Sequence, residues 1–211
     1  VFDMEQLEVY KGPQTYAFGP NAMAGVINIQ SLNPTPFKSG KVEIGANSDK
    51  GNTIGVTFSN SIYQNAAFRI TAYRNYTDGF INDAYRGLTN TNKQDEQYLR
   101  IKLKWEPISW LNIKLTNLLG IMENGYDTWA PDNNGTTTYT DYQGNDEITT
   151  KSFSLKTNLQ KLNLHITSIL SYSDNEMKYA FDGDWGNAAF WAESPYNWNP
   201  DIEGYDWAFT D

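Results

Sequence analysis

The chain has 211 residues, a formal net charge of −9 and no cysteine. The lack of cysteine excludes a disulfide framework and a thiolate metal site. The acidic balance argues against a nucleic-acid partner, because phosphates require a basic surface. No stretch approaches the roughly 18 consecutive apolar residues of a membrane helix. A transmembrane barrel stays open, since its strands alternate apolar and polar residues.

Two short strand-like stretches, at residues 7–10 and 26–29, enclose a turn-rich segment near the start of the chain. A Gly-Pro pair beginning at Gly12 predicts a sharp turn after the first run. Gly19 suits a backbone with positive φ, and Gly25 allows two backbones to approach closely before the second run. We expect two short strands joined by tight turns.

After an extended linker at residues 33–36, apolar and polar residues alternate with the period of two that is typical of strands. The clearest stretch sets Leu99 and Ile101 against Arg100 and Lys102. The seven alternating stretches are residues 41–46, 53–58, 67–73, 98–105, 111–116, 152–159 and 162–170.

The connections between these stretches are of two kinds. Residues 106–109 and 160–161 are short turns, whereas residues 77–95 and 122–150 are long and polar. Short turns at one end and long loops at the other are typical of outer-membrane barrels. The sequence therefore predicts an all-β fold, a transmembrane antiparallel β-barrel represented by about seven strands in an open, curved sheet.

The opening segment carries an ordered string: Glu5-Gln6-Leu7-Glu8-Val9-Tyr10-Lys11-Gly12-Pro13, then Tyr16-Ala17-Phe18-Gly19, Asn21-Ala22 and Gly25-Val26-Ile27-Asn28-Ile29. This string resembles the end of the plug domain of TonB-dependent outer-membrane receptors of the siderophore-receptor type. The signature positions are Glu8, Lys11, Gly12, Pro13, Gly19, Asn21, Ala22, Gly25 and Asn28.

The sequence departs from the family pattern at three of its positions. Lys11 stands where an arginine is usual, Ala24 replaces a second glycine, and Pro20 follows Gly19. Lysine lacks the bidentate pairing of arginine, so an ion-pair lock between plug and barrel would be looser at Lys11.

The resemblance implies two parts, the end of a plug domain at residues 1–36 and the first part of a barrel with long extracellular loops at residues 37–211. The chain would be a piece of a longer, multi-pass protein of the Gram-negative outer membrane. The implied function is active, TonB-coupled import of a scarce ligand, in the first place a ferric siderophore, and cobalamin or a glycan within the same family. The implied partners are outer-membrane lipid, a small iron chelate, and a periplasmic TonB-type protein that acts through an N-terminal segment outside this chain.

Two other classes of function are weighed against a receptor. A closed outer-membrane barrel with an adhesin or structural role would show the same strands, but it would not need the string at residues 11–29. An outer-membrane hydrolase would need a nucleophile–histidine pair, and His165 is the only histidine, with no Gly-x-Ser-x-Gly sequence to receive it. A lone imidazole is also a poor metal site. We therefore expect no enzyme activity, no cofactor and no metal.

The segment that follows the seventh stretch is both aromatic and acidic. Its candidate ligand contacts are Phe181, Asp182, Asp184, Trp185 and Trp191. The alternative is an interfacial aromatic girdle together with packing of the loop on itself. A cation site at the two aspartates lacks the further oxygen ligands that calcium needs, so we expect a turn with solvated carboxylates.

A row of basic residues shares the polar face of the strands, which would be the barrel interior: Arg69, Arg100, Lys102, Lys104 and Lys114. We expect these side chains to pair with carboxylates on neighbouring strands or on the plug, such as Glu5 and Glu8. The competing hypothesis is an electropositive wall that attracts anionic ligands such as ferric chelates.

Overall fold

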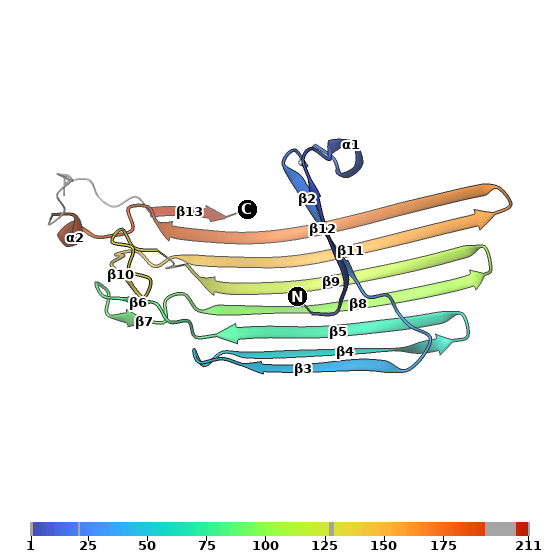
Figure 1. The fold of residues 1–211 in the computed structure, drawn as a ribbon, viewed down its shortest axis with the longest axis horizontal. Coiled ribbons are helices and arrows are strands. Elements are labelled where there is room, and N and C mark those ends of the chain that lie inside the picture. Colours follow the sequence, from blue (N-terminus) through green and yellow to red (C-terminus); the bar gives the residue numbers. More distant parts are fainter. Residues whose placement is uncertain (1, 21, 127–128, 193–205, 211) are drawn as a thin grey trace.

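The computed structural model describes residues 2–20, 22–126, 129–192 and 206–210. Figure 1 shows one long antiparallel sheet and a separate two-stranded hairpin that lies across one of its faces. The long sheet has eight strands, in the order β13 (Asp206–Thr210), β12 (Leu164–Asp182), β11 (Asn145–Lys161), β9 (Leu111–Gly125), β8 (Gln94–Ile108), β5 (Ala66–Thr77), β4 (Asn52–Tyr63) and β3 (Ser39–Ala46).

Each of the seven predicted stretches forms a strand, and β13 is an additional one that the alternation does not reveal. The strands are longer than predicted, with 15 residues in β8 and 19 in β12. A tilted strand needs only about 9–11 residues to cross a bilayer. Within the described residues no ladder joins β3 to β13, so the sheet is open. The predicted all-β class and open sheet are confirmed.

The short turns lie later in the chain than predicted. The loop between β8 and β9 is residues 109–110 instead of 106–109, because an irregularity near the end of β8 keeps the strand paired. The loop between β11 and β12 is residues 162–163 instead of 160–161, and Leu162 has a φ of 53°. The favoured two-residue hairpin turns use such left-handed backbone, which matches the twist of the strands.

The two faces of the long sheet differ in chemistry, and directly paired residues share a face. Val56 and Leu99 belong to an apolar row that stays 43% and 39% exposed. Thr57, Thr71 and Arg100 form a polar row on the opposite face, and all three are buried. We call the face with the polar row and the hairpin the inner face, and the other the outer face. The sheet is thus inside out compared with a soluble one, which would bury the apolar row.

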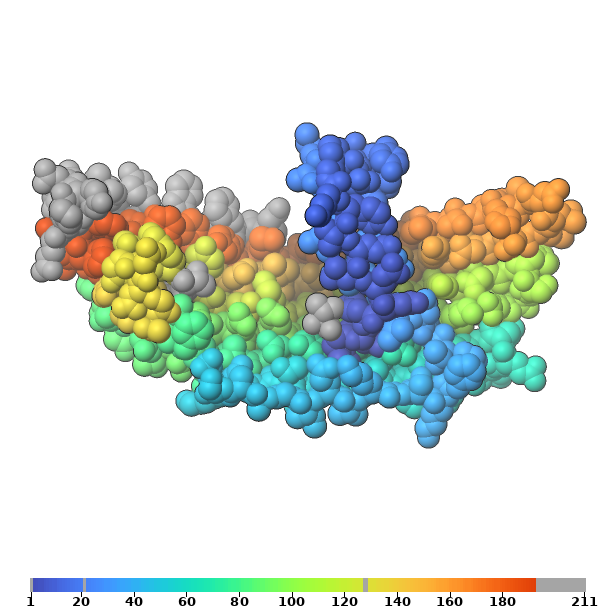
Figure 2. Space-filling model, in the orientation of Figure 1, coloured from blue at the N-terminus to red at the C-terminus, as the bar shows by residue number. Residues whose placement is uncertain are grey.

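The hairpin consists of β1 (Met4–Lys11) and β2 (Gly25–Ser31), paired antiparallel, with the short helix α1 (Thr15–Phe18) in the connection between them. The ring of Tyr10 contacts the ring of Phe18, with centroids 5.5 Å apart, which ties α1 to the end of β1. Figure 2 shows the hairpin standing out in front of the long sheet, crossing its middle.

The glycines of the hairpin behave as their places in the sequence predict. Gly12 and Gly19 have φ of 81° and 92°. Gly25 has a φ of 153°, and a Cβ atom there would lie 2.6 Å from the backbone oxygen of Tyr10. The backbones therefore approach closely at this point, as expected. Asn21 lies outside the described residues.

The long loops are shorter than predicted and contain structure of their own. β6 (Asn82–Asp83), β7 (Leu88–Thr89) and β10 (Thr137–Thr138) form a small sheet in which β10 pairs parallel to β6. A second helix, α2 (Ala188–Ala192), follows β12. Neither helix of the described residues has the length and apolar character needed to cross a membrane.

We expect Gly25→Ala to destabilise the hairpin by about 1–3 kcal/mol, because alanine disfavours this φ and its Cβ meets the Tyr10 oxygen. Amide hydrogen exchange along β1 and β2 would measure the loss of protection. The control is Gly45→Ala in β3, where the new Cβ would lie 3.4 Å from the Thr53 side chain. Equal hairpin protection in both variants would contradict the requirement for glycine at position 25.

Candidate functional site

Asp3 attaches the hairpin to the inner face of the long sheet. Its carboxylate accepts hydrogen bonds from the Arg69 Nε, at 3.0 and 3.1 Å, and from the Arg69 Nη2. Arg100 Nη2 donates to the same carboxylate at 3.0 Å, and Thr71 Oγ1 at 2.6 Å. Asp3 and the two arginines are at most 7% exposed. We call Asp3, Arg69, Thr71 and Arg100 the anchor.

The surroundings of the Asp3 carboxylate favour its ionised form. Burial by itself raises the pKa of Asp3, but the hydrogen bonds from Arg69, Thr71 and Arg100 outweigh burial and hold that pKa below its ordinary value. Two arginines against one carboxylate leave a positive excess, and Arg100 Nη2 also donates to the backbone oxygen of Asp3 at 3.0 Å.

Phe2 fills a space beside the anchor and is 1% exposed. Its ring stacks on Tyr73 with centroids 5.8 Å apart, and Tyr98 donates its hydroxyl proton to the Phe2 backbone oxygen at 2.8 Å. A Cβ atom on Gly55 of β4 would lie 2.9 Å from the Phe2 ring. Gly55 therefore leaves room in the wall for this side chain.

Three further basic residues of the inner face also have protein partners. Lys102 Nζ donates to the backbone oxygens of Ser31 and Leu32 at 2.8 and 3.0 Å. Lys114 Nζ donates to Asn33 Oδ1 at 3.3 Å. Lys104 pairs with Glu106 at 3.1 Å on its own strand. With Lys156, Lys102 and Lys114 border a polar cleft of about 490 Å³ between the hairpin and the sheet.

The expected pairing partners Glu5 and Glu8 are not the ones the structure uses. Glu5 accepts a hydrogen bond from the Asn33 amide, and Glu8 accepts from Asn28 at 2.7 Å, both within the first 36 residues. Asp3 replaces them because its φ of 61° turns the chain into the sheet just before β1. The only sequence signal for Asp3 is its position beside Phe2, a large apolar residue.

The three long loops form one loop cluster. Asp83 is buried and accepts hydrogen bonds from Arg86 Nε at 2.6 Å and from Thr140 Oγ1 at 2.7 Å. These contacts join residues 78–93 to residues 129–144 alongside the parallel pairing of β6 with β10. Asn187 Nδ2 donates to the backbone oxygen of Tyr139 at 2.6 Å, which connects the loop after β12 to the loop that contains β10.

The candidate ligand contacts fall into two aromatic groups within this cluster. Phe181 and Trp185 belong to one group: Trp185 contacts Trp129 edge to face at 5.1 Å, and Phe181 at 6.4 Å. Trp191 belongs to the other group, through Phe190 and Tyr139. Trp129 and Trp185 keep 45% and 39% of their surface exposed. No sequence pattern in residues 122–150 marks Trp129 as a neighbour of Trp185.

The predicted turn with solvated carboxylates is wrong for Asp182. This side chain is 2% exposed and accepts hydrogen bonds from the backbone N–H groups of Asp141 and Asp184, each at 3.1 Å. Its carboxylate is buried because the loop of residues 129–144 packs against the end of β12. Within the described part of the chain, no group of three or more His, Cys, Asp or Glu could hold a metal ion.

Burial raises the pKa of Asp182 to about 7, and the hydrogen bond and charge of Asp184 act in the same direction. Asp182 is the last residue of β12, 18 residues past the start of that strand at Leu164, so it lies beyond any bilayer-crossing stretch. Its ionisation near neutral pH would place a second negative charge beside Asp184.

We expect Asp3→Asn to weaken attachment of the hairpin by about 3 kcal/mol or more, because it leaves two buried arginines without a counter-charge. A fluorophore at Tyr16→Cys, an exposed position in a chain without cysteine, would report detachment in a urea titration. The control is Glu5→Gln, which removes an exposed charge of the same hairpin. An unchanged midpoint for Asp3→Asn would contradict the anchor.

We expect the loop cluster to lose stability as the pH rises from about 4 through 7. The folded-state pKa of Asp182 is raised above the ordinary value of 3.8, so the folded state binds more protons in this range. Amide exchange at Asp141 and Asp184, measured at pH 5.5 and 8, would show weaker protection at the higher pH. Asp182→Asn should remove most of this difference, and a difference that persists would contradict the assignment.

No family model matches the chain. Three solved structures are similar over most of its length. The ferric yersiniabactin uptake receptor FyuA from Yersinia pestis has a TM-score of 0.77 at 19% identity, covering 85% of this chain and 29% of its own. For the open form of the ferric-catecholate import receptor Fiu from E. coli K12, the TM-score is 0.71 at 18% identity, with 99% and 34% covered. For the siderophore receptor PiuA from Acinetobacter baumannii, it is 0.71 at 14% identity, with 86% and 27% covered.

The chain thus spans about a third or less of each of these structures. The likeness concerns the fold, because the identities are low. It agrees with the resemblance of residues 5–29 to the end of a plug and with the inside-out chemistry of the sheet. The chain has the fold of a fragment of the TonB-dependent siderophore receptors, with a plug-type hairpin on the inner face of part of an outer-membrane β-barrel.

Proposed function

We propose that the chain is part of an outer-membrane receptor that imports a ferric siderophore and is driven by a periplasmic protein of the TonB type. The observation that carries this proposal is the hairpin, which is attached by the buried anchor to the inner face of an inside-out sheet. A barrel with an adhesin or structural role has no need of a separate element inside its wall.

The outer face supports a location in the membrane. Along β9, the outer-face residues Leu111, Ile113 and Leu115 are apolar, and Leu119 and Ile121 continue the row after one asparagine. Lipid is the medium in which such a face is stable, whereas water would favour its burial against another layer. The division that follows is a plug end at residues 1–36 and barrel strands at residues 37–211.

The inner-face contacts suit a plug that must move. Besides the ion pairs of Asp3, Lys102 and Lys114 donate hydrogen bonds to residues 31–33, and a polar cleft separates part of the two surfaces. Water can replace polar contacts when they separate, so opening costs less than exposing an apolar interface of the same area. Such an interface is compatible with an energy-coupled gate.

The loop cluster is the proposed place of first contact with the ligand. Loops held on a rigid scaffold commonly carry binding residues, and the loops here are joined to one another by buried hydrogen bonds. The rings of Trp129 and Trp185 meet edge to face, and both remain exposed. The ferric yersiniabactin and ferric-catecholate receptors that share the fold support an iron chelate as the ligand.

Deletion of the gene, followed by growth under iron limitation with candidate ferric siderophores added singly, would test the function. We expect growth on one of them to depend on the gene. Dependence on cobalamin or a glycan instead would assign the receptor another ligand, and no dependence on any ligand would contradict import.

We expect Trp185→Ala to weaken binding of the imported ferric siderophore by about tenfold or more, because exposed aromatic anchors carry a large share of binding energy. Binding to whole cells at several ligand concentrations would give the Kd. Trp110→Ala, at the turn between β8 and β9, removes a tryptophan from the opposite end of the sheet and should leave the Kd unchanged. Equal affinity in both variants would remove Trp185 from the site.

A further inference from the structure

Asn134 and Gly135 form an exposed asparagine–glycine pair in the loop between β9 and β11, and the import function does not use them. Residues 132–136 are all exposed. An asparagine before glycine can react with its own backbone, because glycine has no side chain to shield its nitrogen from the amide carbon. The sequence has one other such pair, Asn124 and Gly125, so the two can be compared.

Thr136 holds the side-chain carbonyl group of Asn134 with two donors. Asn134 Oδ1 accepts hydrogen bonds from the Thr136 backbone N–H at 3.1 Å and from the Thr136 hydroxyl at 3.0 Å. On the other side, the backbone N–H of Asn134 donates to Asp132 Oδ1 at 2.9 Å. Two donors on one carbonyl oxygen make its carbon more electrophilic, and they stabilise the negative charge that the oxygen carries after a nucleophile attacks.

The backbone nitrogen of Gly135 is the nucleophile that lies next to this carbon along the chain. Its N–H donates no hydrogen bond to any residue that the structure describes. A Cβ atom placed on Gly135 would meet no other atom within 4 Å, so this part of the backbone is open to water. The nitrogen can therefore lose its proton to hydroxide without first breaking a hydrogen bond within the protein.

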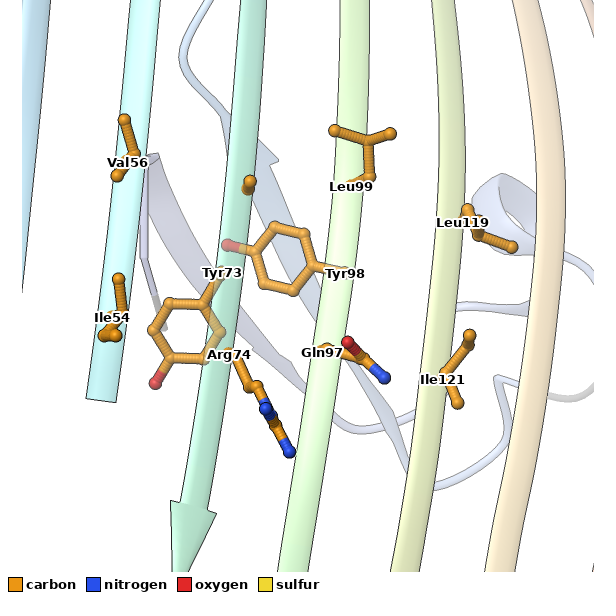
Figure 3. A pocket seen from close by; sticks show the side chains of 10 residues that line it. Ile54, Val56, Tyr73, Arg74, Gln97, Tyr98, Leu99, Leu119 and Ile121 are labelled. Atoms are coloured by element: carbon orange, nitrogen blue, oxygen red, sulfur yellow. The ribbon is translucent and has the colours of Figure 1, made fainter. Parts of the chain in front are cut away.

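Asn124 and Gly125 are in the opposite situation, at the end of β9 and within its ladder with β11. Figure 3 shows β9 nearby, at Ile121, where it runs beside β8. Asn124 Oδ1 accepts from the backbone N–H of Asp95 at 3.0 Å, and the Gly125 N–H donates to the backbone oxygen of Lys93 at 2.9 Å. Both reacting groups of this pair are thus bonded to residues at the start of β8.

We propose that Asn134 is a site of spontaneous deamidation that Thr136 promotes. The Gly135 nitrogen gives its proton to hydroxide and attacks Asn134 Cγ, and the new C–N bond closes a succinimide ring. The bond between Cγ and Nδ2 then breaks, and the amide nitrogen leaves as ammonia with a proton taken from water. Water opens the ring at either carbonyl, which gives aspartate or isoaspartate at position 134. The net reaction consumes water and releases ammonia, with no oxidant or cofactor.

The reaction acts on the loop cluster through Thr136. The Thr136 backbone oxygen accepts from the Asn82 N–H at 3.0 Å, beside the parallel pairing of β10 with β6. Isoaspartate lengthens the backbone just before Thr136 and removes the amide oxygen that Thr136 holds. The pairing of β10 with β6 is therefore looser in aged receptor molecules than in new ones.

Peptide mapping by mass spectrometry tests the proposal on the full-length receptor, kept at neutral pH for increasing times. We expect Asn134 to convert about tenfold faster than Asn124 in the same sample, because Asn124 and Gly125 must first give up their hydrogen bonds. Labelling with a protein isoaspartyl methyltransferase would identify the isoaspartate. Equal conversion at the two asparagines, or none at Asn134, would overturn the proposal.

Thr136→Val removes one of the two donors and should slow conversion of Asn134 about fivefold, because one hydrogen bond no longer stabilises the charge on Oδ1. Thr136→Ser keeps the hydroxyl and should convert at the wild-type rate. Thr137→Val, which changes the next residue and leaves both donors in place, is the matched control. A merely structural role for Thr136 predicts the opposite sign, since a loosened loop lets Gly135 reach the amide carbon more often. Conversion of Thr136→Val at or above the wild-type rate would therefore overturn the role of Thr136.

Amide hydrogen exchange at Asn82 measures the effect on the loop cluster. Aged wild-type receptor should lose protection there relative to fresh receptor. Aged Asn134→Gln should keep its protection, because the longer side chain closes a ring with the backbone much more slowly. Equal protection in aged and fresh wild-type receptor would overturn the loosening of β10 and β6. None of these measurements depends on import, so they test the inference separately from the proposed function.

Discussion

The burial of one carboxylate between two arginines organises this molecule. Arg69 and Arg100 lie on the inner face of the long sheet, and neither could be buried without a counter-charge. Asp3 supplies that charge from a segment 66 residues earlier in the chain than Arg69. An apolar surface on the hairpin could not satisfy these arginines, so the hairpin must present a polar group to the inner face at this point.

Most of the sheet follows from local sequence. The alternation of Leu99 with Arg100 determines which face each residue of β8 occupies, and pairing carries that choice to the neighbouring strands. The strand ends do not follow, because residues 145–150 are polar except for Ile148 and show no alternation. There the backbone ladder with β9 and β12 sets the length of the strand, and no side-chain pattern records it.

The site could be predicted only in part. The inner-face position of Arg69 and Arg100 follows from the alternation of apolar and polar residues along their strands. Their partner, in contrast, depends on how a distant turn directs Asp3. In the loops, Trp185 stands out by composition, whereas its contact with Trp129 depends on packing between segments that share no local pattern. From the sequence, Asp182 is expected to be a surface turn residue. It is buried because the loop that contains Asp141 packs against it, and the Asp141 N–H group donates to its carboxylate.

Gly55 and Phe2 have a consequence for how the hairpin returns after any displacement. Gly55 has no side chain, and the Phe2 ring occupies the space that this leaves in the sheet. The ring fits there in only one position of the hairpin. The ring itself is stacked on Tyr73, so a shifted hairpin would lose both its stacking partner and its seat. The shape of the inner face therefore defines the position of the hairpin, in addition to the ion pairs that hold it.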